Sequence, residues 1–178
     1  MAKRLFKICG ITFFSLIAVI VTAHVVLRPQ MKPLSMGTIA TRIVVEKSKH
    51  QLTLYDADKV LRIYQVSFGR GGLAAKQREG DRLTPEGQYT ISGRNARSRY
   101  HLSLRISYPD PKDIKRAAEQ GVSAGSDIML HGLHNGLGWL GVAQRQLDWT
   151  QGCIALTNPE IEELWRVVPD GTVIEIKA

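Results

Sequence analysis

The chain has 178 residues, of which 44% are hydrophobic and 22% charged, a composition that excludes an intrinsically disordered protein and suits one folded domain. Its formal net charge of +8 includes three basic and no acidic side chains in residues 1–27, so the remainder carries 21 basic and 16 acidic groups. These basic residues are scattered without a nucleic-acid-binding motif, so they are interpreted as ordinary solvated charge, and a basic surface for an anionic partner other than nucleic acid is the alternative.

The first 27 residues are typical of a targeting segment. Basic residues precede an apolar run over residues 8–27 that contains no Asp, Glu, Lys or Arg and is long enough to span a bilayer. Such a charge distribution predicts a cytoplasmic N-terminus and an exported, periplasmic or otherwise extracytoplasmic, C-terminal part. The length favours an uncleaved signal anchor in the inner membrane, whereas Val21-Thr22-Ala23 leaves a cleaved signal peptide open.

A tether and a β-rich domain follow. Residues 28–41 contain Pro and Gly with little periodicity and are interpreted as a tether, so the folded domain is expected over residues 42–178. Alternation of apolar and polar residues between turn signals predicts seven short strands. They lie at residues 42–47, 51–55, 60–68, 88–92, 101–107, 127–131 and 172–177.

Two short helices are predicted among these strands. Asp110 can cap the first helix with Pro111 at its first position, and Gly121 can close it. Asn158 is predicted to cap the second helix, with Pro159 at its first position. Seven strands and two helices make this an α+β domain dominated by β-structure.

Cys153 is the only thiol outside the apolar segment, so it has no partner for a disulfide within the domain. His131 lies upstream, at the end of a predicted strand, and can act as the proton acceptor that a nucleophilic cysteine needs. A histidine partner would also lower the pKa of the thiol. Cys153 and His131 are therefore the candidate catalytic residues.

Glycines next to both residues suit the same chemistry. A backbone carbonyl at Gly132 can accept from one imidazole nitrogen and fix the tautomer that leaves the other nitrogen free. Gly152 allows a tight turn, so that the N–H groups of Gly152 and Cys153 can face a developing oxyanion.

The pattern resembles the L,D-transpeptidase (YkuD-type) catalytic domain, in which a histidine is followed by a spacer and then by Ser/Thr-His-Gly-Cys and a hydrophobic residue. Here 18 residues separate His131 from Thr150-Gln151-Gly152-Cys153-Ile154. The turn Thr84-Pro85-Glu86-Gly87 and the strand end Ile106-Ser107-Tyr108-Pro109 also match this family. The resemblance covers most of residues 42–177.

This resemblance implies a mixed β-sandwich and a cysteine enzyme without metal or organic cofactor. Cys153 would attack a peptidoglycan stem peptide and form a thioester. An amine would then resolve the thioester, making a 3–3 cross-link or attaching a protein to the stem peptide. Two alternatives stay open: an L,D-carboxypeptidase or hydrolase that uses water in place of the amine, and a non-catalytic wall-binding module.

Two positions depart from the commonest family motif. Gln151 replaces a histidine two residues before the cysteine, and Ala155 replaces an arginine two residues after it. If that arginine pairs with a substrate carboxylate, its replacement by Ala155 leaves the preference for the donor or acceptor substrate open. The candidate substrate contacts are Thr150, Gln151, Tyr108, Arg99, His134 and Trp139. His134 is not expected to bind zinc with His131 and Cys153, because no fourth ligand is evident.

Overall fold

The computed structural model describes residues 32–178, within which Leu34–Ala178 form one compact unit. The predicted targeting segment, residues 1–27, lies outside the described residues. Among the helices that are described, none is both long and apolar enough to cross a membrane.

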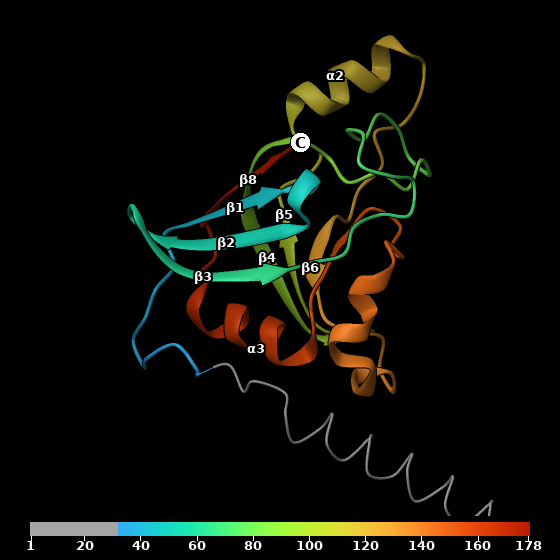
Figure 1. Ribbon diagram of the computed structural model, residues 1–178. Helices are drawn as coiled ribbons and strands as arrows, with labels where there is room; N and C mark the ends of the chain where they lie inside the picture. The colour runs from blue at the N-terminus through green and yellow to red at the C-terminus, as the bar shows by residue number, and fades with distance from the viewer. Residues whose placement is uncertain (1–31) are drawn as a thin grey trace, which may run out of the picture. The chain divides into compact units, whose positions relative to one another are not determined.

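One mixed eight-stranded sheet dominates residues 32–178 (Figure 1). Its strand order is β3-β2-β1-β8-β4-β5-β6-β7, and all neighbours are antiparallel except the pairs β1–β8 and β6–β7. The strands are β1 Arg42–Glu46, β2 Gln51–Asp56, β3 Lys59–Gln65, β4 Gly87–Ser98, β5 His101–Ile106, β6 Met129–His131, β7 Ile154–Ala155 and β8 Val173–Lys177. The predicted β-dominated α+β class is confirmed.

Strand β4 joins the two halves of the sheet. Its first residues pair with β8 and the following ones pair with β5, so the predicted sandwich takes the form of one continuous sheet. The two edges of the sheet also meet, because Ser67 lies just after β3 and bridges to Ala155 in β7. The Ser67 N–H donates to the Ala155 carbonyl at 3.1 Å, and the Ala155 N–H donates back at 2.8 Å. The sheet therefore curls until its edges are hydrogen-bonded.

The predicted strands agree with this sheet except at two places. β4 continues to Ser98, well past the predicted end at residue 92, because its polar second half is a solvent-exposed ribbon without an apolar pattern. β7 was not predicted, since its two residues are too few to show any periodicity.

Two α-helices are described, α2 (Pro111–Glu119) and α3 (Asn158–Val167), and Figure 1 shows them at opposite ends of the domain. Asp110 caps α2 as predicted, in a capping box with Asp113. The predicted cap of α3 was one residue off, because Thr157 makes the capping box there with Glu160. The Asn158 side chain instead accepts the N–H of Leu133 at 2.9 Å, next to the histidine loop.

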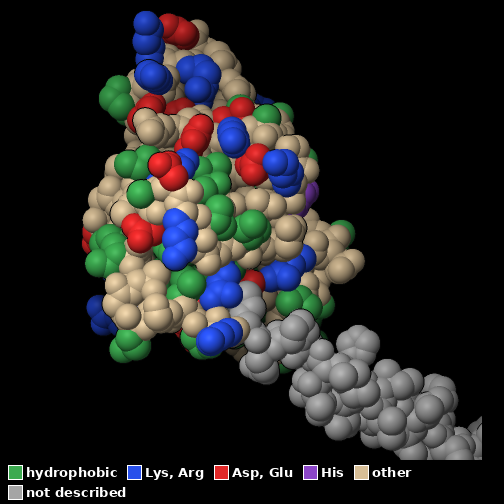
Figure 2. Space-filling view, turned by 60° about the vertical axis from the view of Figure 1, so that its left-hand side comes forward, with side chains coloured by type: hydrophobic (Ala, Val, Ile, Leu, Met, Phe, Trp, Pro, Cys, Tyr) green, Lys and Arg blue, Asp and Glu red, His purple; other side chains and the backbone are tan. Residues whose placement is uncertain are grey.

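Two 3₁₀ segments complete the described elements. One, η1 (Lys47–Lys49), connects β1 to β2. The other, η2 (Gly138–Gln146), lies in the stretch between His131 and Cys153. Figure 2 shows Lys and Arg interspersed with Asp and Glu on the face that it presents, in agreement with the scattered charges of the sequence.

The hydrophobic core draws side chains from both halves of the sheet and from α3. It extends into the predicted tether, because Ala40 is fully buried and Leu34 packs against the core. The Leu34 N–H also donates to a Glu163 carboxylate oxygen of α3 at 2.8 Å. The packed domain thus begins at Leu34, ahead of the boundary expected at residue 42.

Candidate active site

The parallel pairing of β6 and β7 brings the histidine and cysteine segments together. His131 ends β6 and is in register with Ala155 of β7, while Leu130 is in register with Ile154. Cys153 immediately precedes β7 and lies near the start of β6, where its Sγ donates to the Asp127 carbonyl at 3.6 Å. Residues that are far apart in the sequence therefore lie on adjacent strands.

His131 is held in one tautomer. Its Nδ1 lies 2.7 Å from the carbonyl oxygen of Gly132. A carbonyl can only accept, so Nδ1 carries the proton and Nε2 keeps its lone pair. Burial lowers the pKa of His131, and the hydrogen bond to Gly132 offsets part of this effect. The imidazole is thus a neutral base with its free nitrogen defined.

The Cys153 thiol differs from the expectation. Burial raises its pKa, and the Asp127 charge adds to this effect, whereas the backbone of Met129 and the Lys76 charge oppose it. The lowered thiol pKa expected beside His131 was therefore wrong. A raised thiol pKa and a lowered imidazole pKa both favour the neutral forms, which suits proton transfer during attack better than a resting ion pair.

Thr150 shapes the turn that carries the thiol. Its Oγ1 donates to the Cys153 carbonyl at 2.7 Å and accepts the Gly152 N–H at 3.1 Å. Thr150 is only 4% exposed, so it organises the turn and has almost no surface for substrate. Because the Gly152 N–H already donates to Thr150, an oxyanion would have to compete with Thr150 for this donor.

Gly152 is required by its surroundings. Its φ of +124° is a conformation that only glycine adopts at low cost. A Cβ at this position would also lie 2.7 Å from the carbonyl oxygen of Leu83. The loop that contains Leu83 therefore forms one wall of the cysteine turn.

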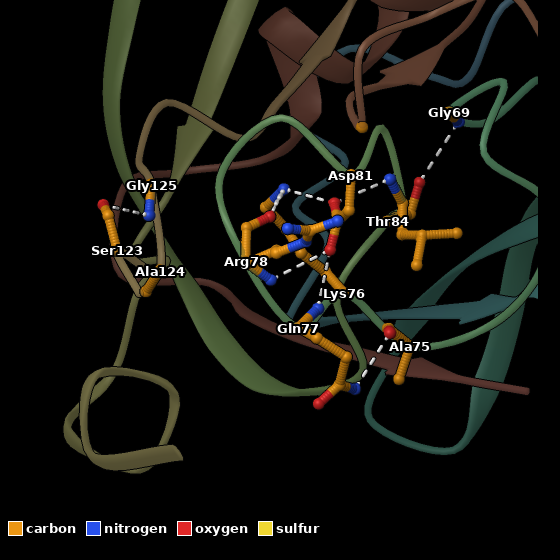
Figure 3. Close-up of polar contacts among 12 residues, drawn as sticks. Gly69, Ala75, Lys76, Gln77, Arg78, Asp81, Thr84, Ser123, Ala124 and Gly125 are labelled. Carbon is orange, nitrogen blue, oxygen red and sulfur yellow. Dashed lines mark hydrogen bonds and ion pairs between the residues drawn. The ribbon is translucent and has the colours of Figure 1, made fainter. Parts of the chain in front are cut away.

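A buried ion pair organises that loop, which connects β3 to β4 (Figure 3). The Asp81 carboxylate accepts four hydrogen bonds. The donors are Lys76 Nζ at 2.7 Å and the backbone N–H groups of Gln77 at 2.8 Å, Arg78 at 2.9 Å and Leu83 at 3.0 Å. Burial alone would raise the Asp81 pKa, but these donors outweigh it and lower the pKa to about 2. Asp81 thereby fixes the position of Leu83 beside Gly152.

Two aromatic rings surround the imidazole. The Tyr100 ring centroid lies 4.5 Å from that of His131, and the Trp149 centroid lies 5.6 Å away in an edge-on arrangement. Trp149 therefore borders the histidine on one side. Tyr100 was missed, because no motif distinguishes it from the other tyrosines of the sequence.

The predicted substrate contacts separate by exposure. Tyr108 is 5% exposed and its hydroxyl donates to the Ala124 carbonyl at 2.7 Å, so it belongs to the core. Gln151 and Arg99 are exposed. His134 is exposed and stacks edge-on against Tyr100, with a centroid distance of 5.5 Å. Trp139 is 73% exposed on η2.

An apolar groove of about 220 Å³ lies next to the Trp149 side of His131. Its walls are mainly aliphatic side chains of η2 and its flanks. They are Leu133, His134, Leu137, Leu140, Ala143, Gln144, Gln146, Leu147 and Trp149. Trp139 is not among them. In residues 32–178 no three His, Cys, Asp or Glu side chains converge on a point where they could hold one metal ion.

Two solved structures share this fold. The helical cell shape determining protein Pgp2 from Campylobacter jejuni superposes with a TM-score of 0.57 at 24% identity, covering 83% of this chain and 52% of that chain. An L,D-transpeptidase from Mycobacterium smegmatis gives a TM-score of 0.52 at 17% identity, covering 78% and 59% of the two chains. These likenesses establish the fold.

Sequence comparison identifies the family. The Escherichia coli (strain K12) protein YafK, which is assigned as an L,D-transpeptidase, is 29% identical over 138 residues, or 74% of this chain. The chain spans about half, 48%, of the length of YafK. The family model for the YkuD L,D-transpeptidase catalytic domain matches residues 40–176. The chain therefore belongs to the YkuD family of L,D-transpeptidase catalytic domains.

Proposed function

We propose that this chain is a peptidoglycan L,D-transpeptidase that works through a cysteine thioester. The observation that carries the proposal is the hydrogen bond from His131 Nδ1 to the Gly132 carbonyl. That bond leaves Nε2 as a base on the strand that pairs with the segment following Cys153. This combination of a fixed imidazole and a lone thiol is the arrangement that nucleophilic cysteine chemistry requires.

In the first half-reaction the Cys153 sulfur attacks the carbonyl carbon at the L-centre of the diamino acid in a stem peptide, while His131 takes the thiol proton. The backbone N–H of Cys153 is assigned to the oxyanion, because the Gly152 N–H is held by Thr150. The carbon–nitrogen bond then breaks and the terminal D-amino acid leaves as an amine, taking the proton from His131. The product is a thioester on Cys153.

In the second half-reaction an amine attacks the thioester carbonyl. His131 accepts a proton from the amine, an amide bond forms, the carbon–sulfur bond breaks and the thiol is regenerated. An amine on another stem peptide gives a 3–3 cross-link, and an amine on a protein attaches that protein to the wall. If water attacks in place of the amine, the same site acts as an L,D-carboxypeptidase.

A peptidoglycan substrate requires the domain to lie outside the cytoplasm, which is compatible with the exported topology expected from residues 1–27. Peptidoglycan stem peptides are the proposed partners, together with the membrane through that segment and a wall-attached protein as a further acceptor. The name of Pgp2 as a determinant of helical cell shape is compatible with wall remodelling by a protein of this fold. Neither a metal nor an organic cofactor takes part in the proposed steps.

The test is acylation of the purified chain by a carbapenem, followed by intact mass. We expect one adduct on the wild-type chain and none on Cys153→Ala. The His131→Ala variant should acylate at least about a thousandfold more slowly, because nucleophile and base act as a unit. Lys49→Gln, which removes an exposed ion pair with Glu46, is the control and should react normally.

The same set of variants distinguishes transfer from hydrolysis and from a non-catalytic wall-binding function. With a disaccharide tetrapeptide as substrate, cross-linked dimers in the mass spectrum support transfer, and tripeptide alone supports hydrolysis. A wall-binding module predicts that the Cys153→Ala variant retains every activity of the wild type. A folded wild-type chain that neither acylates nor converts the tetrapeptide would refute the enzyme proposal.

A further inference from the structure

An exposed ion pair borders the thiol and has no part in the chemistry described so far. Arg105 Nη2 lies 2.9 Å from Asp127 Oδ1. Asp127 is the residue whose backbone carbonyl accepts the Cys153 thiol at 3.6 Å. The backbone of Asp127 thus contacts the reacting sulfur, while its carboxylate pairs with Arg105.

The sheet register places Arg105 on the same side as the catalytic histidine. Arg105 pairs with Met129 and Ser103 pairs with His131 across β5 and β6. Paired residues of adjacent strands point to the same face, and residues two apart along a strand share that face. Arg105 and His131 consequently share one face of the sheet, and Arg105 lies toward the end of β6 where Cys153 lies.

Arg105 also supplies a charge that the cysteine motif lacks. The family motif often has an arginine where this chain has Ala155, which is fully buried. Ala155 is in register with His131, so its side chain points to the same face as that of Arg105. A guanidinium from β5 can thus serve the region that an arginine on β7 would otherwise serve.

The pair is open enough to exchange partners. Both side chains are 56% exposed, and exposed ion pairs contribute little to stability. Asp127 has a φ of +59°, an unusual conformation for a residue with a side chain, and its second carboxylate oxygen lies 3.2 Å from Ser126 Oγ. A ligand with one positive and one negative group can replace this ion pair without leaving either charge unpaired.

We propose that Arg105 and Asp127 form the acceptor subsite, which binds the zwitterionic α-amino acid end of the incoming substrate. Asp127 receives the ammonium group and Arg105 the carboxylate on the same carbon. This inference rests on the proposed function, and its ligand is the free amino acid centre of a diamino acid or a free D-amino acid. The ammonium is thereby held next to the thioester that it must attack.

At this subsite the bound amine replaces the Cys153 sulfur on the acyl carbon. The bound ammonium loses one proton to bulk water and becomes an amine, and the amine forms a new carbon–nitrogen bond to the thioester carbonyl. His131 takes the second proton that this nitrogen loses. The carbon–sulfur bond breaks, and the sulfur recovers a proton from the imidazolium. Neither Arg105 nor Asp127 exchanges a proton with the product.

The experiment measures the two half-reactions separately on the full chain. The donor is a stem tetrapeptide whose side-chain amine is acetylated, so that it can acylate Cys153 and cannot act as acceptor. The acceptors are D-methionine, D-methionine amide and hydroxylamine. The variants are Arg105→Gln and Asp127→Asn, the latter because asparagine tolerates the same positive φ. Lys49→Gln removes a comparable surface pair and is the control.

Removal of the Asp127 charge also changes the surroundings of the Cys153 thiol, so acceptor kinetics are measured on the thioester already formed and each variant is compared with its own rate of thioester formation. For D-methionine, Asp127→Asn should raise KM about tenfold or more, because a charged hydrogen bond is lost, with a smaller change in kcat. Arg105→Gln should remove the preference for D-methionine over its amide. Hydroxylamine, which has no carboxylate, should react equally with all variants.

Two results would overturn the inference and leave the proposed function standing: wild-type discrimination between D-methionine and its amide in both variants, or equal losses with all three acceptors. A wild-type chain that never forms the thioester would instead refute the proposed function. The two failures are therefore distinguishable.

Discussion

At the scale of single residues, burial shifts the pKa values of both Cys153 and His131 toward their neutral forms. The His131 pKa is lowered from 6.5, so the imidazole stays able to accept a proton in mildly acidic solution, and protonation disables it only as the pH falls through the lowered value. The Cys153 pKa is raised from 9.0, so the thiol stays protonated at neutral pH. We therefore expect carbapenem acylation to stay level from neutral pH to below pH 6.5 and to decline only in stronger acid.

Two measurements check this profile. The acylation rate is followed by intact mass across the pH range, and the ultraviolet absorbance of the thiolate is titrated on the unreacted chain. The absorbance should rise only above pH 9.0. A thiolate signal already present at neutral pH, and absent from Cys153→Ala, would show a resting ion pair and contradict the neutral one.

The residues that carry the proposed chemistry could be predicted from the sequence, whereas the residues that surround them could not. Cys153 and His131 stand out as a lone thiol and a histidine at matched spacing, and the Gly132 carbonyl lies where the tautomer argument required it. Tyr100 and Asp127 reach the site only through pairing of β4, β5 and β6. Such residues share no local pattern with the cysteine, so no window of sequence reveals them.

At the scale of elements, the loop between β3 and β4 depends on one carboxylate. The folded-state pKa of Asp81 is about 2 and its ordinary value is 3.8, so its ionisation stabilises the fold above pH 3.8, and this contribution is lost as the pH falls toward 2. The shift corresponds to about 2 kcal/mol of unfolding free energy. Asp81→Asn should lower stability at neutral pH by about this amount, because Lys76 is then buried without its counter-charge.

Urea unfolding at neutral pH and in acid measures the effect. The difference between wild type and Asp81→Asn should be largest at neutral pH and should shrink as the solution is acidified toward the Asp81 pKa. Glu119→Gln, which removes an exposed carboxylate on α2, is the control and should leave unfolding nearly unchanged. A difference that stays constant with pH would show that the charge of Asp81 is not responsible.

Elements with a local signal were predicted well, and elements held by tertiary contacts were not. The capping box at Asp110 and the hairpin of β1 and β2 follow from nearby residues alone. β7 has two residues and exists because β6 and Ser67 supply its hydrogen-bond partners. η2 contains a break at Gly141, where the backbone leaves the helical region, so no helical periodicity marks it.

At the scale of the whole molecule, the strand order lies beyond local reasoning. The last strand, β8, is inserted between β1 and β4, so the middle of the sheet forms only when the end of the chain is present. The same long-range closure brings α3 against residues from the start of the domain. Composition and turn signals establish the β-dominated class, but the contacts that complete the sheet connect residues that are far apart in sequence.

Glu163 on α3 tests this long-range closure. Its carboxylate accepts the Leu34 N–H at 2.8 Å and the Tyr64 hydroxyl at 2.7 Å, and it pairs with Arg62 of β3 at 3.2 Å. Glu163→Ala would leave the buried Tyr64 hydroxyl without its acceptor, at a cost of about 2–3 kcal/mol in unfolding free energy. Its neighbour Glu162 is 55% exposed and pairs with His101 at the surface, so Glu162→Ala should change stability by less than about 1 kcal/mol.

The two variants together separate stability from activity. Chemical unfolding should rank Glu163→Ala well below both Glu162→Ala and the wild type. Carbapenem acylation of the folded fraction should be the same in all three, because the hydrogen bonds and ion pair of Glu163 join it to β3 and to the start of the domain, away from Cys153 and His131 in the sequence. Equal unfolding of the two variants would mean that the partners of Glu163 find water or other acceptors. The joining of α3 to Leu34 and β3 would then depend on apolar packing alone.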